Sequence, residues 1–528
     1  LNSYSYNADQ QLTAVTQQDV NGGNVVASKE ADFAYNALGQ VTDTWAYNTL
    51  GGPRTDVYHG AYGYDGDSRL TSLAYTSNAG ATTIDSFGWT YNAASLVTSF
   101  TSNNGTASYA YDPTNQLTSA GYTTANGGNQ PANESYSYTV NGNRNSTGYS
   151  TGSDNLITSD GTFNYQHDAD GNTTVRTRIS GAYAADYKTT FTWDYRNRLT
   201  DVDYYDNSDV LTKHVHYVYD VFNHLIATDV DSTGSGSYDI EQHDVLDVTP
   251  EVPLAGLPGM APAPPVLEFD AGGALTDRVF EAMGRILAQG SVSSPTTADV
   301  PNWMLTNNQG SVVYVLDNTG AVVDQIVYNS FGAVAYESNP SVAHFAGYAG
   351  GHVDFFTGLV DDDNRWYDPI DAKWLSNDPA GFLAGDPDLS CYGLNDPTNR
   401  TDPTGLDSGP GVWDNFIYYA SHPSAMPTSY YVGYVAAGAI AATAAAAAMA
   451  IWVSGMVAAN AAAAAAGEAE AAAAKAGMQA AAKDAVMAEI GQGTFPGAIG
   501  PWNGPVWWNL PPNPLGPFGP GPFPLGPF

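Results

Sequence analysis

Residues 62–71 read Tyr62-Gly63-Tyr64-Asp65-Gly66-Asp67-Ser68-Arg69-Leu70-Thr71, and this pattern recurs through the first half of the chain. Two aromatic residues at alternate positions precede Asn or Asp, turn residues follow, and Leu or Val beside Thr or Ser begins the return. A spacing of 26 to 29 residues separates most copies, a sequence signature of a repeat architecture. The second aromatic residues are Tyr6, Tyr35, Tyr64, Tyr91, Tyr111, Tyr138, Tyr165, Trp193 and Tyr219.

Each copy predicts one β-hairpin. Alternate side chains of a strand share a face, so the two aromatic rings of a copy point to the same side, and Asn, Asp and Gly form the turn. One hairpin cannot bury that aromatic face alone, so neighbouring copies must join a continuous sheet. The repeat therefore predicts a mainly β protein, and by itself it predicts no catalytic activity.

The composition excludes several classes of protein. The chain has 528 residues, with 17 Lys and Arg against 54 Asp and Glu, a net charge of −37 that disfavours nucleic acid as a partner. A single cysteine, Cys391, cannot form an intramolecular disulfide. Residues 168–172 have acidic spacing like that of a calcium loop but lack its bidentate Glu, so we predict no metal site and no cofactor. The first residues already fit the repeat, with no signal peptide visible, so we expect the natural protein to extend upstream.

The repeats resemble the YD repeats of Rhs proteins, teneurins and the C components of bacterial Tc toxins. That resemblance implies a spiralling antiparallel β-hairpin shell around a large cavity, whereas the periodicity alone is equally compatible with a filled solenoid. The most specific part of the match runs from Thr357 to Leu406 and resembles the terminal plug of the RHS repeat-associated core. It contains Arg365-Trp366-Tyr367-Asp368-Pro369, Trp374-Leu375-Ser376-Asn377-Asp378-Pro379 and Asn399-Arg400-Thr401-Asp402-Pro403-Thr404-Gly405-Leu406. One departure is Val360-Asp361-Asp362, where relatives are typically aromatic.

The chain divides by composition and motif into four parts. We predict a YD-repeat β-shell over 1–246, a Pro-rich linker or strap over 247–268, an RHS repeat-associated core domain with its plug over 269–406, and a variable C-terminal region over 407–528. In the last part, we predict an apolar helix over 430–459, which is also a transmembrane candidate. We predict an Ala-rich helix over 461–490 and a disordered tail of Pro, Gly and Phe over 495–528. An alternative for 430–459 is an Ala-rich helical segment packed inside the shell.

The candidate catalytic residues are Arg365, Asp378 and Asp402. If both carboxylates meet in a partly desolvated pocket, their repulsion raises one pKa and the pair shares a proton. One carboxylate would then activate water while its protonated partner polarises the scissile carbonyl or protonates the leaving amine, and Arg365 would fix the ionised member through a bidentate contact. The alternative is a structural role, because Asp-Pro is also a good turn starter.

In the Rhs family that the chain resembles, this arrangement is a self-cleaving aspartyl protease that cuts just after the last Asp-Pro-x-Gly-Leu. Carried over by position, the cut falls between Leu406 and Asp407. The region after Leu406 has two Lys, no Arg and no motif of a turnover enzyme, so a nuclease is disfavoured there.

Two functions remain open from the sequence. In the first, a bacterial toxin shell encloses its own C-terminal region as cargo, releases it by autoproteolysis after Leu406, and works with a shell-closing or secretion partner. The cargo would be secreted or would act on a membrane through 430–459. In the second, the chain is a non-enzymatic, cell-surface or teneurin-like adhesion scaffold with an apolar C-terminal anchor.

Overall fold

The computed structural model describes residues 2–410, with gaps at 20–25, 52, 53, 55, 78, 79, 126, 182–185, 222, 247–264, 284, 295, 343, 344, 382–385, 403, 407 and 408. The described residues are almost entirely antiparallel β-structure, which confirms the mainly β prediction. Their helices are short 3-10 turns: η1 (Ser153–Asn155), η2 (Tyr348–Gly350) and η4 (Gly393–Asn395). Within these ranges no helix is long and apolar enough to span a membrane, and the predicted segments 430–459, 461–490 and 495–528 lie outside them.

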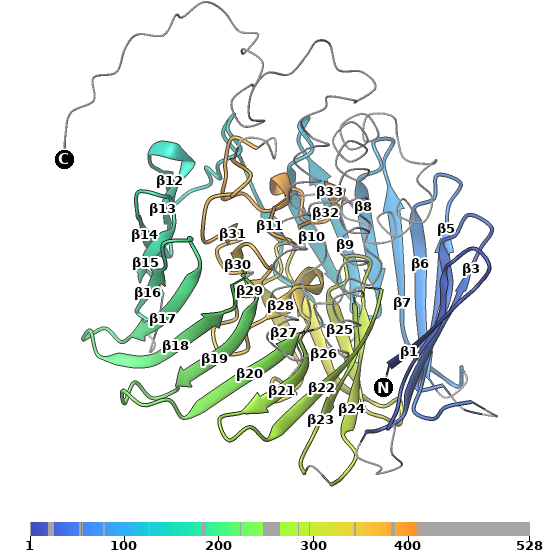
Figure 1. Ribbon diagram of the computed structural model, residues 1–528. Helices are drawn as coiled ribbons and strands as arrows, with labels where there is room; N and C mark the ends of the chain where they lie inside the picture. The colour runs from blue at the N-terminus through green and yellow to red at the C-terminus, as the bar shows by residue number, and fades with distance from the viewer. Residues whose placement is uncertain are drawn as a thin grey trace, which may run out of the picture. The chain divides into compact units, whose positions relative to one another are not determined.

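The first sheet contains eleven strands, and each strand pairs with the next one along the chain (Figure 1). These strands are β1 (Asn2–Tyr6), β2 (Leu12–Gln17), β3 (Lys29–Tyr35), β4 (Val41–Tyr47), β5 (Tyr58–Tyr64), β6 (Leu70–Ser77), β7 (Thr82–Tyr91), β8 (Val97–Ser102), β9 (Gly105–Tyr111), β10 (Leu117–Thr124) and β11 (Glu134–Ser135). Between β11 and the next strand the pairing stops, and an isolated bridge joins Tyr138 to Arg144. The repeat pattern did not predict this interruption.

The second sheet contains sixteen strands in the same sequential order. They are β12 (Tyr149–Thr151), β13 (Ile157–Asp160), β14 (Phe163–His167), β15 (Thr173–Arg178), β16 (Lys188–Trp193), β17 (Leu199–Tyr205), β18 (Leu211–Tyr219), β19 (Leu225–Asp231), β20 (Ile240–Leu246), β21 (Pro265–Asp270), β22 (Leu275–Ala282), β23 (Arg285–Ser291), β24 (Val300–Thr306), β25 (Val312–Leu316), β26 (Val322–Tyr328) and β27 (Val334–Glu337).

This sheet continues across the predicted linker. Strand β21 begins at Pro265 and pairs with β20 on one side and β22 on the other, although 247–268 was expected to be a linker or strap. Proline is tolerated as the first residue of a strand, which accounts for the difference. The four-part division of the chain stays a prediction.

Residues 345–406 fold into short pieces; this segment contains the predicted plug Thr357–Leu406, and the whole of it is called the plug from here on. It contains the small sheet β28 (His352–Val353), β29 (Val360–Asp361), β30 (Trp366–Asp368) and β31 (Lys373–Trp374). Strand β32 (Arg400–Thr401) pairs with β33 (Gly409–Pro410), which lies just beyond the plug.

In most repeats an Asn or Asp forms the hairpin turn through its side chain. Its Oδ1 accepts hydrogen bonds from the backbone N–H groups two and four residues later, and the residue three positions on commonly has a positive φ, as at Gly39 and Ser68. The residues that do this are Asn7, Asn36, Asp65, Asn92, Asp112, Asp168 and Asp194. Asp168 is therefore a turn residue like the others.

The second aromatic residue of a repeat ties it to an earlier strand. Its OH or ring N–H donates to the backbone carbonyl at or near the start of the preceding return strand, at 2.6 to 2.9 Å. The pairs are Tyr35 to Leu12, Tyr64 to Val41, Tyr91 to Leu70, Tyr111 to Val97, Tyr138 to Leu117, Trp193 to Thr173 and Tyr219 to Leu199. A buried hydroxyl needs such a partner, so this contact explains why the position is so often Tyr.

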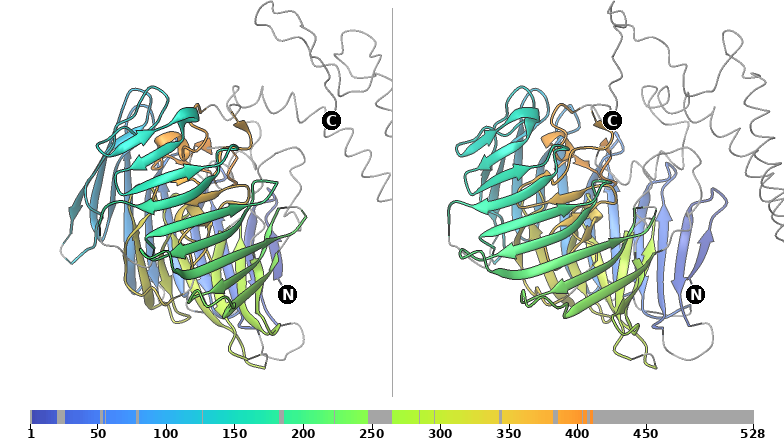
Figure 2. Two further views of the ribbon diagram at one scale, coloured as in Figure 1. Left: turned by 90° about the vertical axis from the view of Figure 1, so that its left-hand side faces the viewer. Right: turned by 60° about the vertical axis from the view of Figure 1, so that its left-hand side comes forward.

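The plug contacts both sheets, and Figure 2 shows its orange strands between the blue and green ones. On the first sheet, Asn399 Oδ1 accepts from Val97 N–H at 2.7 Å. On the second, Thr173 N–H donates to Leu375 O at 2.7 Å, and Trp366 packs with Val215 in one apolar cluster. A separate cluster joins strands of the two sheets directly, with Leu73 and Trp303 among its fully buried members. The plug is thus held in a fixed position against both sheets.

Candidate active site

Arg365 immediately precedes β30 and lies at the centre of the candidate site. The residue is 4% exposed, and its guanidinium lies 4.2 Å from the centroid of the Trp374 ring. Its Nη1 donates to Leu389 O at 3.2 Å. Burial lowers the pKa of Arg365, and the negative charges of Asp402 and Asp378 act in the opposite direction. A guanidinium keeps its charge under such a shift, so the site holds a buried cation.

The two predicted carboxylates meet at this cation. Arg365 Nη2 lies 2.9 Å from Asp378 Oδ2 and 2.8 Å from Asp402 Oδ2. The contact differs from the bidentate one expected from the sequence, because a single nitrogen serves both carboxylates while the other two nitrogens bind carbonyls. The three residues named from the sequence therefore do lie together, and a positive charge between the carboxylates reduces their mutual repulsion.

Both carboxylates also hold backbone N–H groups. Asp378 Oδ1 accepts from Ala380 N–H at 2.7 Å, which is the turn expected of an Asp-Pro sequence. Asp402 Oδ1 accepts from Leu406 N–H at 3.0 Å. The side chain of Asp402 is 1% exposed and that of Asp378 is 7% exposed, so Asp378 is the more accessible of the two.

The chain approaching the predicted cleavage point is folded back onto these residues. Arg365 Nε donates to Gly405 O at 2.6 Å, one residue before Leu406. Gly405 has a φ of +62°, and a Cβ there would lie 2.9 Å from Arg365 N and 3.0 Å from Asp362 O. Only glycine fits this conformation and approach without strain. Leu406 is described and Asp407 lies outside the described residues.

Asp362 is a third carboxyl beside the site, and sequence reasoning did not assign it a role. The residue is 2% exposed, and its backbone N–H donates to Arg365 O at 3.1 Å. Burial and then the negative charge of Asp402 raise its pKa well above the ordinary range. The sequence signal was the acidic residue in Val360-Asp361-Asp362, at a position typically aromatic in the resembling family.

The plug strands that carry the site are anchored by a buried ion pair. Arg176 of β15 lies 2.5 Å from Asp368 Oδ2 and 3.2 Å from Asp371 Oδ2 through its Nη1. Arg176 also lies over the Phe163 ring, 4.9 Å from its centroid. The second sheet thereby fixes the end of β30, and β30 begins directly after Arg365.

Known proteins resemble parts of this chain in sequence. The Teneurin YD-shell family matches residues 289–388. Human Teneurin-4 is 33% identical over 76 residues, which is 14% of this chain and 3% of that protein. The toxin protein Tse5 of Pseudomonas aeruginosa is 35% identical over 101 residues, 19% of this chain and 8% of Tse5. The chain therefore spans a small part of the length of these relatives.

Solved structures resemble the fold over a longer range. The crystal structure of TcdB2-TccC3-TEV superposes with a TM-score of 0.53 at 18% identity, covering 77% of this chain and 21% of that one. The crystal structure of TcdB2-TccC3 gives a TM-score of 0.51 at 18% identity, covering 77% and 22%. At this identity the likeness concerns the fold alone. Repeats, plug, sequence relatives and fold together support an RHS/YD-repeat shell protein.

Proposed function

We propose that this chain is a toxin shell of the RHS kind, which encloses its own C-terminal region and releases it by one self-cleavage between Leu406 and Asp407. The observation that carries the proposal is the convergence of Asp378 and Asp402 on one buried arginine that also binds Gly405 O. Turn formation alone would not require both carboxylates to share a buried cation. It would also not require that cation to hold the backbone beside the cut.

The proposed reaction is hydrolysis of one peptide bond. Asp378, the more accessible carboxylate, removes a proton from water, whose oxygen bonds to the Leu406 carbonyl carbon. The bond from that carbon to the Asp407 nitrogen breaks, and the nitrogen takes up a proton. Asp402 and Arg365 position the chain, since they hold Leu406 N–H and Gly405 O. The products are a Leu406 carboxylate and a free Asp407 amine.

Asp362 is the proposed source of the proton for the leaving amine. A general acid must be protonated when it acts, and burial together with the charge of Asp402 raises the pKa of Asp362 in that direction. In the mechanism predicted from the sequence, Asp378 and Asp402 share this proton. Because Arg365 contacts both of those carboxylates, we place the neutral carboxyl at Asp362 in this proposal.

The shell role rests on the fold and on the sequence relatives. Tse5 is described as a toxin protein, and the TcdB2-TccC3 structures share the fold. On that basis we propose that the C-terminal region 407–528 is the cargo of the shell and that the protein is secreted or lies at the cell surface. A shell-closing or secretion partner, action on a membrane through 430–459 and a bacterial source belong to the same proposal.

Variants of the carboxylates test the cleavage. We expect the expressed chain to give two fragments on denaturing electrophoresis, and Asp378→Asn or Asp402→Asn to give an intact chain with an unchanged far-UV circular dichroism spectrum. Asp112→Asn is the matched control. Asp112 makes the same side-chain turn before a proline, with Thr114 N–H at 2.8 Å and Gln116 N–H at 3.0 Å. An intact parental chain, or cleavage that persists in Asp378→Asn, contradicts the proposal.

The second candidate is a non-enzymatic, cell-surface adhesion scaffold with an apolar C-terminal anchor. The match to the Teneurin YD-shell family favours it, because that match covers residues 289–388 and ends before the C-terminal region. This function predicts an uncleaved chain that fractionates with membranes. Expression of residues 407–528 alone separates the two, since toxicity to the host cell is expected only for a released cargo.

A further inference from the structure

The outward face of strands β17 to β20 carries a row of carboxylates and imidazoles. It lies opposite the apolar cluster that contains Val202, Val215 and Val230. The register places Asp201 opposite His216, His216 opposite Asp229, and Asp229 opposite Glu241. Four adjacent strands thus present ionisable side chains side by side.

The histidines on β18, in the first part of this row, already have carboxylate partners. Asp203 Oδ1 lies 2.6 Å from His214 Nδ1, and Asp201 Oδ1 lies 2.8 Å from His216 Nδ1. The two imidazoles stack with their centroids 6.4 Å apart, and Tyr238 stacks on both. Each of these imidazoles therefore has its carboxylate at hydrogen-bond distance.

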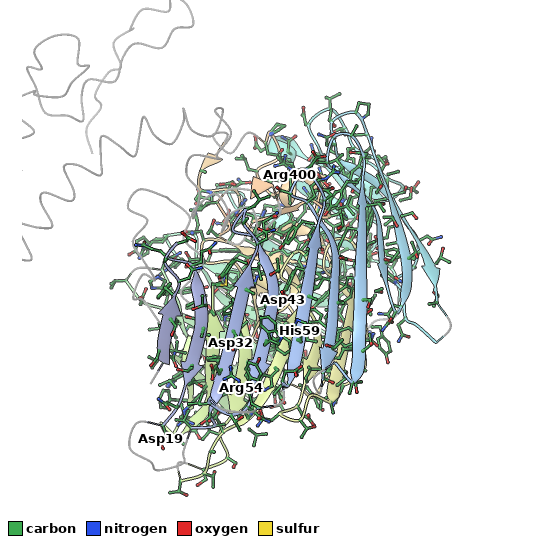
Figure 3. The ribbon with its side chains drawn as sticks, turned by 90° about the vertical axis from the view of Figure 1, so that its right-hand side faces the viewer. Asp19, Asp32, Asp43, Arg54, His59 and Arg400 are labelled. Carbon is green, nitrogen blue, oxygen red and sulfur yellow. The ribbon has the colours of Figure 1, made fainter. Side chains whose placement is uncertain are left out.

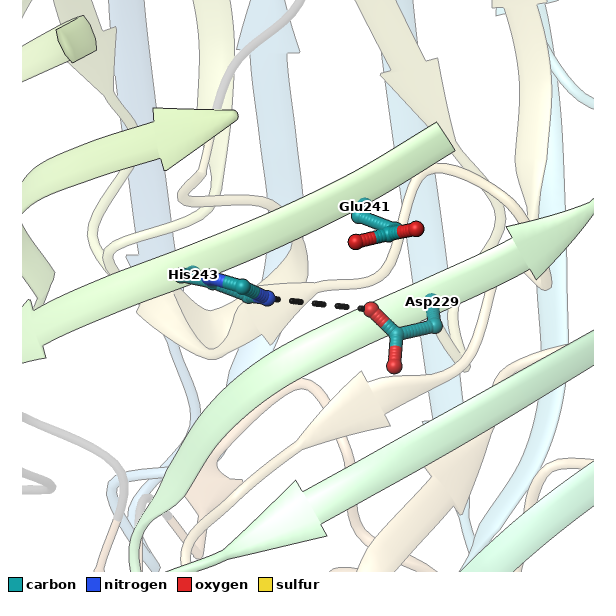
Figure 4. Close-up of side chains that lie close together, drawn as sticks. All are labelled: Asp229, Glu241 and His243. Carbon is teal, nitrogen blue, oxygen red and sulfur yellow. Dashed lines mark ion pairs between the residues drawn. The ribbon is translucent and has the colours of Figure 1, made fainter. Parts of the chain in front are cut away.

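The last part of the row is different, as Figure 4 shows. Asp229 Oδ1 is buried and accepts no hydrogen bond from any described residue. His243 Nε2 lies 3.9 Å from this oxygen, which is beyond hydrogen-bond distance. Glu241 stands directly opposite Asp229 on the neighbouring strand, and like charges in that position destabilise a sheet. Two carboxylates and one imidazole therefore face a common point without bonding to one another.

We propose that Asp229, Glu241 and His243 bind a divalent transition-metal ion that joins β19 to β20. One ligand atom from each residue lies within 4.8 Å of the other two. Tetrahedral ligands at about 2 Å from a zinc ion lie about 3.3 Å apart, so Asp229 Oδ1 and His243 Nε2, which are 3.9 Å apart, need only a small approach. Glu241 closes the site with a small side-chain rotation.

The ligand set determines the class of ion. One imidazole with two carboxylates suits Zn²⁺ and similar ions, whereas Ca²⁺ and Mg²⁺ prefer oxygen ligands alone. The exposed side of His243, which is 48% exposed, leaves room for water as a fourth ligand. A dication would neutralise the two opposed carboxylates and satisfy the buried Asp229 Oδ1.

The test is zinc binding by the full chain after treatment with a chelator. Titration calorimetry with ZnCl₂ is expected to show one ion per chain, and Zn²⁺ is expected to raise the thermal unfolding midpoint. His243→Ala and Glu241→Gln should each weaken binding at least tenfold and remove that rise. Glu241→Gln keeps the shape of the side chain, so it remains informative if the histidine variant folds poorly.

The control is His59→Ala on the first sheet. His59 Nε2 lies 2.9 Å from Asp43 Oδ1 across β4 and β5, an imidazole–carboxylate pair in which Figure 3 labels both members. Zinc binding should be unchanged in that variant. The proposal is overturned if the chain takes up no zinc, if His243→Ala binds zinc as tightly as the parent, or if His216→Ala abolishes binding that His243→Ala leaves intact.

Discussion

Gly405 shows how one residue can fix the geometry of the site. Its φ of +62° and the 2.9 Å separation between a built Cβ and Arg365 N leave no room for a side chain. We expect Gly405→Ala to lower the unfolding midpoint, at a cost of about 1–3 kcal/mol, and to slow self-cleavage at least tenfold. Time courses on denaturing gels and thermal melts measure the two effects.

Gly358 provides the matched control for that substitution. Its φ is +74°, but a Cβ there would meet nothing within 4 Å. Gly358→Ala should therefore carry only the conformational cost, about 1 kcal/mol, and should leave cleavage unchanged. Equal cleavage rates in both variants would mean that the approach of Gly405 to Arg365 is unimportant for the reaction.

The candidate residues were predictable to different degrees. Asp378 and Asp402 stood out because Asp-Pro motifs near Gly405-Leu406 resemble a known family, yet sequence spacing alone does not bring loops 24 residues apart together. Arg365 Nη2 contacts both carboxylates because the guanidinium is held in place by the Trp374 ring and by the carbonyls of Leu389 and Gly405. Asp362 was noted only as a departure from the family and was given no role, because an acidic residue in a polar run is usually exposed.

At the scale of the repeat, the second aromatic residue is expected to contribute through its hydroxyl. Tyr138→Phe removes the 2.8 Å hydrogen bond to Leu117 O while keeping the ring. We expect a loss of about 1 kcal/mol in the free energy of unfolding, measured by chemical denaturation. Tyr195→Phe, at a position 93% exposed, should change it by less than about 0.5 kcal/mol. Equal losses in both variants would contradict the role given to this hydroxyl.

Two opposed carboxyls give the sheet a pH dependence. Asp244 of β20 faces Glu268 of β21, and burial raises the pKa of Asp244 to about 7 and that of Glu268 to about 8. Each carboxyl has a higher pKa in the folded chain than in the unfolded chain, so its protonated form stabilises the folded state. That stabilisation is complete below about pH 4, which is the pKa of these groups in the unfolded chain. This contribution is lost as the pH rises through 7 and 8.

Glu268→Gln is expected to flatten that pH dependence. Thermal midpoints measured from about pH 5 to pH 9, with a chelator present, should fall less steeply in this variant than in the parent. Asp67→Asn is the control, because the Asp67 side chain is 78% exposed. A slope that Glu268→Gln leaves unchanged would show that the carboxyl titrates normally in the folded protein.

The strands were predictable because local chemistry determines them. Asn or Asp caps each turn through its own side chain, as at Asp65, and alternate aromatic residues assign the buried face. The break after β11 and the strand at Pro265 were not predictable, since both depend on which segments pair across the sheet. The row that ends at His243 was also missed, because a one-residue change in register would move it to the other face.

At the scale of the whole molecule, the plug is held by Arg176. Arg176→Ala would leave Asp368 and Asp371 buried without their cation, and breaking such a pair costs about 3–5 kcal/mol. We expect a large fall in the unfolding midpoint. Arg178→Ala on the same strand loses a more exposed pair with Asp186 and should cost less than about 1 kcal/mol. Similar costs for both arginines would contradict the anchoring role.

The proposed self-cleavage changes the covalent state of the chain after it folds. Intact mass spectrometry of freshly purified protein, followed over time, tests it most directly. We predict two products in equal amounts, one ending at Leu406 and one beginning at Asp407, and a single full-length mass for Asp378→Asn. A full-length mass that persists in the correctly folded parent, or a cut at another peptide bond, would contradict it.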